Sequence, residues 1–257
     1  MTEMGTHEIS ESPVEKSRLD FDPNIRKVDA SYSKEAEGAP NPESVLHDPE
    51  ALSKPMEGLS ETREGFHQLE NGNTLFDRPG ETGEMLNHDQ GNAVKRVEGD
   101  CGLVSAENVA RMAGKDVSEA DVVDIARVNG DCDYGIFKNP GDNGGATSEQ
   151  IKDVLGRLGI DADVKEKPSV DDVAKAVESG RGVIACVRTG EFWEDPAYDG
   201  GGHAVTVTSV ERGPDGDVVA FRVCDSGTGG KDSCRAVSAD LLESSLMETV
   251  VTDKPIR

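Results

Sequence analysis

The apolar residues of this chain change their spacing near residue 180, and that change restricts the fold. Between residues 100 and 180 they recur every three or four positions, which is the period of amphipathic helices. After residue 181 they form short β-branched runs over 182–188, 203–211 and 218–224, which are typical of strands. Helices first and strands second predict an α+β domain with an antiparallel sheet.

The starts of the predicted helices carry capping signals. The first helix begins at Cys101, with Asp100 as its N-cap, and ends at Gly114. Each of the next three follows a Ser or Thr that has an acid or a Gln three residues later, the pattern of a capping box. These pairs are Ser118 with Asp121, Thr147 with Gln150, and Ser169 with Asp172. The Gly- and Asn-rich loop over 129–146 is long enough to predict a functional rim or lid.

The second half of the chain predicts a hairpin. The runs 203–211 and 218–224 are joined by Gly213-Pro214-Asp215-Gly216-Asp217, which is typical of a tight turn. A short strand over 160–164 is expected before the fourth helix. A last strand near 235–237 and a helix over 239–247 are expected to complete the domain.

The N-terminal third differs in composition from the rest. Residues 1–85 are rich in Glu, Ser, Pro and Asn and have no sustained helical or strand period, so we expect a disordered acidic region there. Only 35% of the whole chain is hydrophobic, which also favours one domain and a tail over two domains. We therefore expect a single folded domain over 86–257.

The charge of the chain excludes some classes of partner. A formal net charge of −24 repels phosphate backbones and anionic lipid, so nucleic acid and membrane surfaces are not expected partners. A basic peptide, or an immunity or inhibitor protein, is compatible with it. No run reaches 18 apolar residues and no signal-peptide core follows the N-terminus, so we expect a soluble protein. The expected location is the cytoplasm, or outside the cell by a specialised secretion system.

The five cysteines do not form a metal-binding pattern. They lack CxxC spacing and are odd in number, which predicts neither a zinc site nor a complete disulfide framework. Cys224 and Cys234 flank a Gly-rich loop, and their pairing stays open. Cys186 lies within an apolar run and is expected to be an inert core thiol. We expect no metal and no cofactor.

Cys101 and His203 are the candidates for chemistry. A cysteine at a helix start beside an imidazole can act as a thiolate nucleophile, because both neighbours stabilise the negative sulfur. Cys101 stands at such a start, although the adjacent Asp100 carboxylate would oppose a second negative charge. His203 opens a strand after three glycines and is the only histidine of the expected domain core.

Asp225 completes the candidate group. It lies directly after the strand that is paired with the strand of His203, so the hairpin is expected to bring the two side chains together. A carboxylate there would fix the imidazole tautomer and stabilise the imidazolium. The alternative is an Asp that only forms the turn before the following glycines.

Four segments together resemble papain-like cysteine peptidases of the double-glycine-peptidase type, which also occur as modules of bacterial effectors and toxins. These segments are 99–102 around Cys101, 145–148 before a helix, 202–207 around His203, and 225–229 after Asp225. The resemblance covers about residues 90–250. It implies a helical part that carries the nucleophile Cys101 and an antiparallel sheet that carries the base His203 and the orienting Asp225.

The same family has a glutamine about six residues before the cysteine that binds the oxyanion, and this sequence has Lys95 there. Gln90 and Asn92 are the candidates to replace it. Losing one oxyanion donor costs on the order of 3 kcal/mol of transition-state stabilisation. Trp193, Gly201 and Gly202 precede or adjoin the histidine and are predicted to line the substrate groove, although Trp193 can also be read as a loop anchor.

Three functions fit these residues. The first is a thiol peptidase that cleaves a peptide or protein amide, in the manner of a secreted effector or toxin. The second uses the same triad on a glutamine side chain, as a deamidase or transglutaminase, because the acyl-enzyme chemistry is shared. The third is a catalytically inactive relative that holds a peptide in the groove, which the lysine at position 95 favours.

Overall fold

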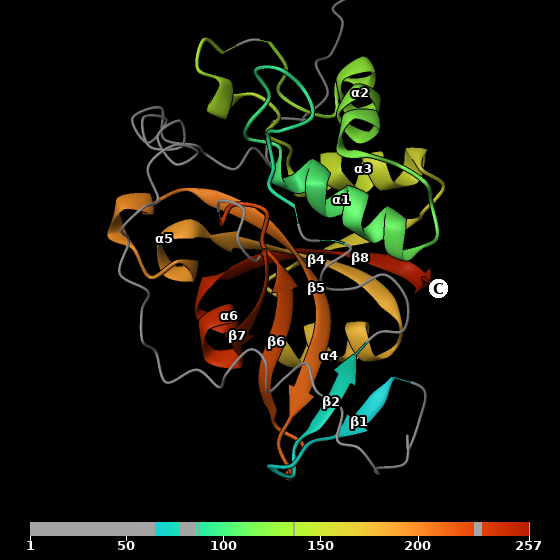
Figure 1. Cartoon of the computed structure of the whole chain (residues 1–257), viewed down its shortest axis with the longest axis vertical. Coiled ribbons are helices and arrows are strands. Elements are labelled where there is room, and N and C mark those ends of the chain that lie inside the picture. Colours follow the sequence, from blue (N-terminus) through green and yellow to red (C-terminus); the bar gives the residue numbers. More distant parts are fainter. Residues whose placement is uncertain (1–64, 78–85, 87, 136, 229–232, 257) are drawn as a thin grey trace, which may run out of the picture.

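The computed structural model describes residues 65–77, 86, 88–135, 137–228 and 233–256, and these residues adopt an α+β fold (Figure 1). Helices α1 (Cys101–Met112), α2 (Glu119–Asn129) and α3 (Ser148–Arg157) lie together on one side of a sheet. Helices α4 (Val170–Glu178) and α6 (Ala239–Ser245) lie on its other side. The predicted fold class, helices with an antiparallel sheet, is confirmed.

Eight antiparallel strands form the sheet in the described part of the chain, in the order β1-β2-β5-β4-β8-β3. Strand β6 pairs with β5 and also with β7. The strands are β1 (Phe66–Gln68), β2 (Thr74–Asp77), β3 (Ala162–Glu166), β4 (Arg181–Arg188), β5 (Gly202–Arg212), β6 (Val218–Cys224), β7 (Cys234–Ser238) and β8 (Leu246–Pro255). The short helical segments are η4 (Pro140–Asp142), α5 (Thr189–Phe192) and η5 (Pro196–Tyr198).

The capping signals explain where the helices begin. All three predicted capping boxes are present, at the starts of α2, α3 and α4, with the reciprocal hydrogen bonds that define the motif. The first helix begins at Cys101 as expected, but the prediction that Asp100 caps it is wrong in chemical terms. Asp100 occupies the N-cap position and its side chain makes no capping hydrogen bond. Its carboxyl group is buried instead.

The sheet is covered on both faces, because successive side chains of its central strands alternate between two cores. In β4, Ile184 packs with the α1–α3 side and Val183 packs with the α4 and α6 side. Polar contacts also join α1 to β5, since Ser105 Oγ donates to the Ala204 carbonyl at 3.2 Å. The two elements that carry Cys101 and His203, α1 and β5, are therefore held in place by packing. Within the described residues, none of the helices has the length and apolar character needed to cross a bilayer.

Strand β8 was not predicted from the sequence. The helix expected over 239–247 ends at Ser245, and the chain enters β8 at Leu246, between β4 and β3. Thr249 and Thr252 are buried in this strand, so polar residues stand at inward positions and the apolar pattern is broken. Tertiary pairing on both sides of β8 decides its conformation, and sequence pattern does not report that.

The predicted start of the folded domain at residue 86 is also wrong. Residues 66–77 form the β1–β2 hairpin, and β2 pairs with β5. Leu75 and Phe76 are buried there, with the rings of Phe66 and Phe76 4.8 Å apart. Strands of three and four residues carry too few apolar side chains to stand out from polar sequence. The rest of the predicted disordered region, residues 1–64 and 78–85, lies outside the described residues.

Candidate active site

Cys101 is the first residue of α1, and its side chain is half-buried. The start of α1 packs tightly on α3, because a Cβ at Gly102 would lie only 2.7 Å from Ile151 Cδ1. The segment before the helix is also held, since Gly99 N donates to the Asn143 carbonyl at 2.9 Å. The partial positive charge at a helix N-terminus favours an anion, so this position suits a thiolate.

The structure brings His203 and Asp225 into direct contact. His203 is the second residue of β5, Asp225 follows β6, and the antiparallel pairing of these strands sets Thr206 opposite Cys224. His203 Nε2 donates to Asp225 Oδ1 at 2.7 Å, although the residues are 22 positions apart. The Cys101 sulfur also acts on this imidazole, because it raises the pKa of His203. With Nε2 committed to Asp225, the ring nitrogen Nδ1 is the one that can exchange a proton with the thiol.

The electrostatics of this group favour an imidazolium. Burial lowers the pKa of His203, but the Asp225 carboxylate and the Cys101 sulfur outweigh it and raise this pKa to about 10. Burial raises the pKa of Asp225, but the His203 imidazolium and then Arg235 hold it well below its usual range. The two pKa shifts agree, because both favour an ionised Asp225 carboxylate paired with a protonated His203 imidazole.

Asp225 is fully buried and receives hydrogen bonds on both carboxylate oxygens. Oδ1 accepts from His203 Nε2 and from Gly227 N, the latter at 3.1 Å. Oδ2 accepts from Trp193 Nε1 at 3.1 Å and from the guanidinium of Arg235 at 3.2 and 3.3 Å. A buried carboxylate needs such donors to stay charged, so Asp225 is more than a turn-forming residue.

Trp193 covers the His203–Asp225 pair. Its ring centroid lies 5.0 Å from that of His203 and 5.0 Å from that of Tyr198, whose ring is nearly perpendicular to the indole. The indole is therefore committed to the Asp225 side of the site. These contacts fit the alternative that Trp193 is an anchor, here one that packs on the catalytic candidates. That it also lines a substrate groove stays a prediction.

The two glycines predicted to line the groove stand where the backbone packs closely, and their groove role stays a prediction. A Cβ at Gly201 would lie 2.4 Å from Thr189 Oγ1, and Gly201 N donates to the Tyr198 carbonyl. Gly202 stands opposite Arg188 in the ladder between β4 and β5. Both positions bring the start of β5 against α5 and β4, which fixes the strand that carries His203.

The two oxyanion candidates have different positions. Gln90 lies between the two halves of the site: its Nε2 donates to the Glu98 carbonyl at 2.8 Å, and its Oε1 accepts from Ser226 Oγ at 3.1 Å. Asn92 is exposed, and its amide donates to the Asp89 carbonyl within its own turn at 3.2 Å. Gln90 therefore joins a residue shortly before Cys101 to the residue after Asp225, whereas Asn92 bonds within its own exposed turn.

Asp100 does not oppose a thiolate as the sequence suggested. Burial is the largest influence, and together with the neighbouring Glu119 carboxylate it raises the pKa of Asp100 to about 9. Asp100 is therefore neutral at pH 7. Glu119 has a second role, because its Oε1 accepts from Gly91 N and Ala93 N at 3.1 and 3.3 Å and so holds the loop after Gln90.

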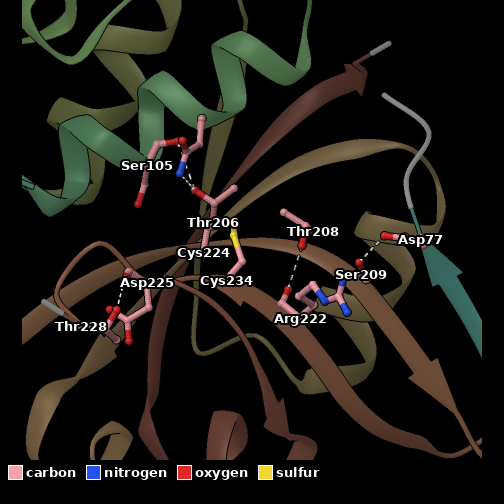
Figure 2. The surroundings of a disulfide bond; sticks show 11 residues. Asp77, Ser105, Thr206, Thr208, Ser209, Arg222, Cys224, Asp225, Thr228 and Cys234 are labelled. Carbon is pink, nitrogen blue, oxygen red and sulfur yellow. Dashed lines mark hydrogen bonds between the residues drawn. A yellow bond between two sulfur atoms is a disulfide. The ribbon is translucent and has the colours of Figure 1, made fainter. Parts of the chain in front are cut away.

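The other four cysteines are either paired in a disulfide or buried. Cys224 and Cys234 form a disulfide, which settles the pairing that the sequence left open (Figure 2). Burial raises the pKa of Cys186 to about 12 and that of Cys132 to about 11, so both are inert thiols, as expected for Cys186. Among the described residues, no group of three or more His, Cys, Asp or Glu side chains is arranged to hold a metal ion.

Sequence reasoning missed the residues that support Asp225 and the Gln90 loop. Arg235 contacts Asp225, and Glu119 holds the loop, but neither belongs to a recognisable motif. Gly227 also contacts Asp225, and it lies in the segment 225–229 that the sequence already singled out, although no role was predicted for it. One signal was present for Arg235. It directly follows Cys234, so a disulfide to Cys224 would have placed it near the residue after Cys224.

The sequence matches no protein-family model and none of the curated proteins. Among solved structures, it is similar to the crystal structure of a candidate C39-like peptidase from Bacillus anthracis. The two share 14% sequence identity with a TM-score of 0.45, over 67% of this chain and 96% of that chain. This likeness is too distant to carry an argument about function.

Proposed function

We propose that this protein is a cysteine-type peptidase that hydrolyses an amide bond of a peptide or protein through Cys101, His203 and Asp225. The observation that carries the proposal is the buried 2.7 Å hydrogen bond from His203 Nε2 to Asp225 Oδ1. The half-buried Cys101 supports it, because its sulfur raises the pKa of the same imidazole. Burying a charged pair costs desolvation free energy, unless good geometry and further hydrogen bonds offset it. Among the residues that the structure describes, Cys101 is the one free thiol that is not buried.

The proposed reaction has two stages. The Cys101 thiolate attacks the carbonyl carbon, and the His203 imidazolium gives a proton from Nδ1 to the leaving amine, so that the C–N bond breaks and a thioester forms. Neutral His203 then takes a proton from water, which attacks the thioester and releases the acid. The C–S bond breaks, the Cys101 thiolate leaves and His203 keeps the proton taken from water, so the thiolate–imidazolium pair is restored. Asp225 holds the imidazole in one tautomer throughout.

The oxyanion of each tetrahedral intermediate needs donors. The backbone N–H of Cys101 is one, because it stands at the start of α1 where the first amides have no helical partner. We assign the second to Gln90 Nε2, since that amide has a second N–H besides the one given to the Glu98 carbonyl. Lys95, at the position where a glutamine was expected, is exposed.

The test is the reactivity of Cys101 followed by a substrate screen. We expect brief iodoacetamide treatment at pH 6 to modify Cys101 rapidly in the wild type and slowly in His203→Ala, because rapid alkylation requires a thiolate. Cys132→Ala is the matched control, and it should leave the labelling of Cys101 unchanged. Labelling of Cys101 no faster than in the urea-unfolded chain would overturn the proposal and favour an inactive peptide-binding relative.

A peptide library then identifies the reaction. Cleavage that is lost in Cys101→Ala and kept in Cys132→Ala is the expected result. Conversion of glutamine to glutamate without chain cleavage would replace the peptidase assignment by that of a deamidase, because both reactions share the thioester.

A further inference from the structure

The two carboxylate oxygens of Asp225 have different partners. Oδ1 is directed at His203, and Oδ2 is held by Trp193 and Arg235. Because the two oxygens share one plane, whatever fixes Oδ2 also fixes the direction of Oδ1. The group on Oδ2 therefore sets the hydrogen bond on which the imidazole depends.

Arg235 reaches Asp225 through several constraints. The β6–β7 ladder sets Cys234 opposite Cys224, and the disulfide between them prevents the two strands from slipping past each other (Figure 2). The guanidinium of Arg235 also lies over the buried ring of Phe192, 4.7 Å from its centroid. Phe192 ends α5, and Trp193 follows it directly. The end of α5 therefore holds both side chains that donate to Oδ2, Trp193 and Arg235.

Charge alone does not explain an arginine at this place. A cation on Oδ2 weakens the attraction of Asp225 for the imidazolium, so on electrostatic grounds it works against a charged His203. An arginine offers geometry as well. Nε and Nη2 both reach Oδ2, at 3.3 and 3.2 Å, from a planar group that stacking keeps from rotating.

We propose that Arg235 is a positioning residue of the proposed active site, which holds Asp225 Oδ2 so that Oδ1 stays directed at His203 Nε2. This inference rests on the proposed function, because it assigns Arg235 to the same reaction. It makes a prediction that a purely electrostatic or purely structural role does not make. If Arg235 positions Asp225, removing the arginine should lower the pKa of His203. If Arg235 acted only as a repelling charge, removing it would raise that pKa.

Three variants separate these roles. Arg235→Met removes the charge and the donors, and Arg235→Lys keeps the charge and one donor. Arg222→Met is the matched control, because Arg222 lies on neighbouring β6 with its side chain directed away from Asp225 (Figure 2). Arg235→Gln serves as a second neutral variant if Arg235→Met does not fold, which a thermal melt decides.

The first readout is the titration of His203, followed by NMR of nitrogen-15-labelled histidine and assigned with His203→Gln. The groups that act on this imidazole are Cys101 and Asp225. We expect Arg235→Met to move the titration to lower pH by about one unit, which is what loss of one charge-assisted hydrogen bond amounts to. Arg235→Lys should recover part of the shift, and Arg222→Met should show none. An unchanged titration, or one moved to higher pH, would overturn the proposal.

The second readout is alkylation of Cys101 at pH 6, where we expect Arg235→Met to be about tenfold slower than the wild type. The two readouts fail independently. If wild-type Cys101 is slow, the peptidase function fails while the titration still reports on Arg235. If wild-type Cys101 is fast and Arg235→Met equals it in both readouts, the positioning role fails and the peptidase function stands.

Discussion

Gln90 is the residue whose role can be separated most cleanly from that of the nucleophile. An oxyanion donor stabilises a tetrahedral intermediate, and alkylation by iodoacetamide forms none. We therefore expect Gln90→Ala to lower kcat for peptide cleavage by about 100-fold. The rate of Cys101 alkylation should stay near that of the wild type.

Asn92→Ala provides the control, because Asn92 bonds within its own exposed turn. It should leave both rates unchanged. A loss of alkylation in Gln90→Ala would show instead that Gln90 acts through its bonds to Ser226 and Glu98, as a support for the two halves of the site. Measured kcat together with the alkylation rate decides between these roles.

Asp100 is expected to cost stability at neutral and alkaline pH. Its pKa rises from the ordinary 3.8 to about 9 on folding, mainly through burial, so the folded chain must keep a proton that the unfolded chain gives up. Asp100→Asn removes that cost and keeps the shape. We expect this variant to be more stable than the wild type to urea at pH 8, with little difference at pH 4. Equal stability of the two proteins at pH 8 would contradict the burial of a neutral Asp100.

The residues that we propose to carry the chemistry could be predicted from sequence, and those that support them could not. Cys101, His203 and Asp225 were candidates because each stands at the end of an element whose start or turn has a local signal. Arg235 and Glu119 act through contacts with residues far away in the chain, at 10 and 26 to 28 positions. Neither distance nor direction of such contacts is encoded in local pattern.

At the scale of elements, the β6–β7 hairpin depends on its disulfide. The bond joins residues 10 positions apart and closes the loop after Asp225. Replacing Cys224 and Cys234 by alanine should lower the free energy of unfolding by about 2–3 kcal/mol, the chain-entropy value for a loop of this size.

Urea unfolding of the double variant, and of the wild type after reduction by a phosphine, measures this effect. The Cys132→Ala variant under the same reductant controls for changes at free thiols. We also expect slower alkylation of Cys101 in the double variant, because Arg235 then depends on strand pairing alone. Unchanged stability in both forms would mean that the ladder between β6 and β7 fixes this hairpin without the bond.

The elements that sequence predicts best here are those with local signals at both ends. Helices α2, α3 and α4 each follow a capping box, and the hairpin of β5 and β6 has a Gly- and Pro-containing turn. The β1–β2 hairpin, α5 and β8 were missed. Each is short or carries polar residues at buried positions, so its conformation is decided by the elements around it.

For the molecule as a whole, three buried groups tie stability to pH. The pKa of Asp225 is lowered on folding, so its contribution is present above the ordinary value of 3.8 and is lost as the pH falls. The pKa of His203 is raised, so its contribution is complete below 6.5 and is lost as the pH rises toward about 10. Asp100 acts in the same direction as His203, from 3.8 to about 9.

These signs place the greatest stability in mildly acidic solution. We expect the free energy of unfolding in urea to be highest near pH 4 and to fall above it by about 1.4 kcal/mol per pH unit through Asp100. Above pH 6.5, His203 adds a fall of about the same size per pH unit. Asp100→Asn should therefore roughly halve the slope between pH 6.5 and pH 9. Repulsion within a chain of net charge −24 acts in the same direction, but about 1 M salt screens it and leaves buried groups unaffected. A slope that vanishes in salt would assign the pH dependence to surface repulsion, and one that persists in salt would assign it to the buried groups.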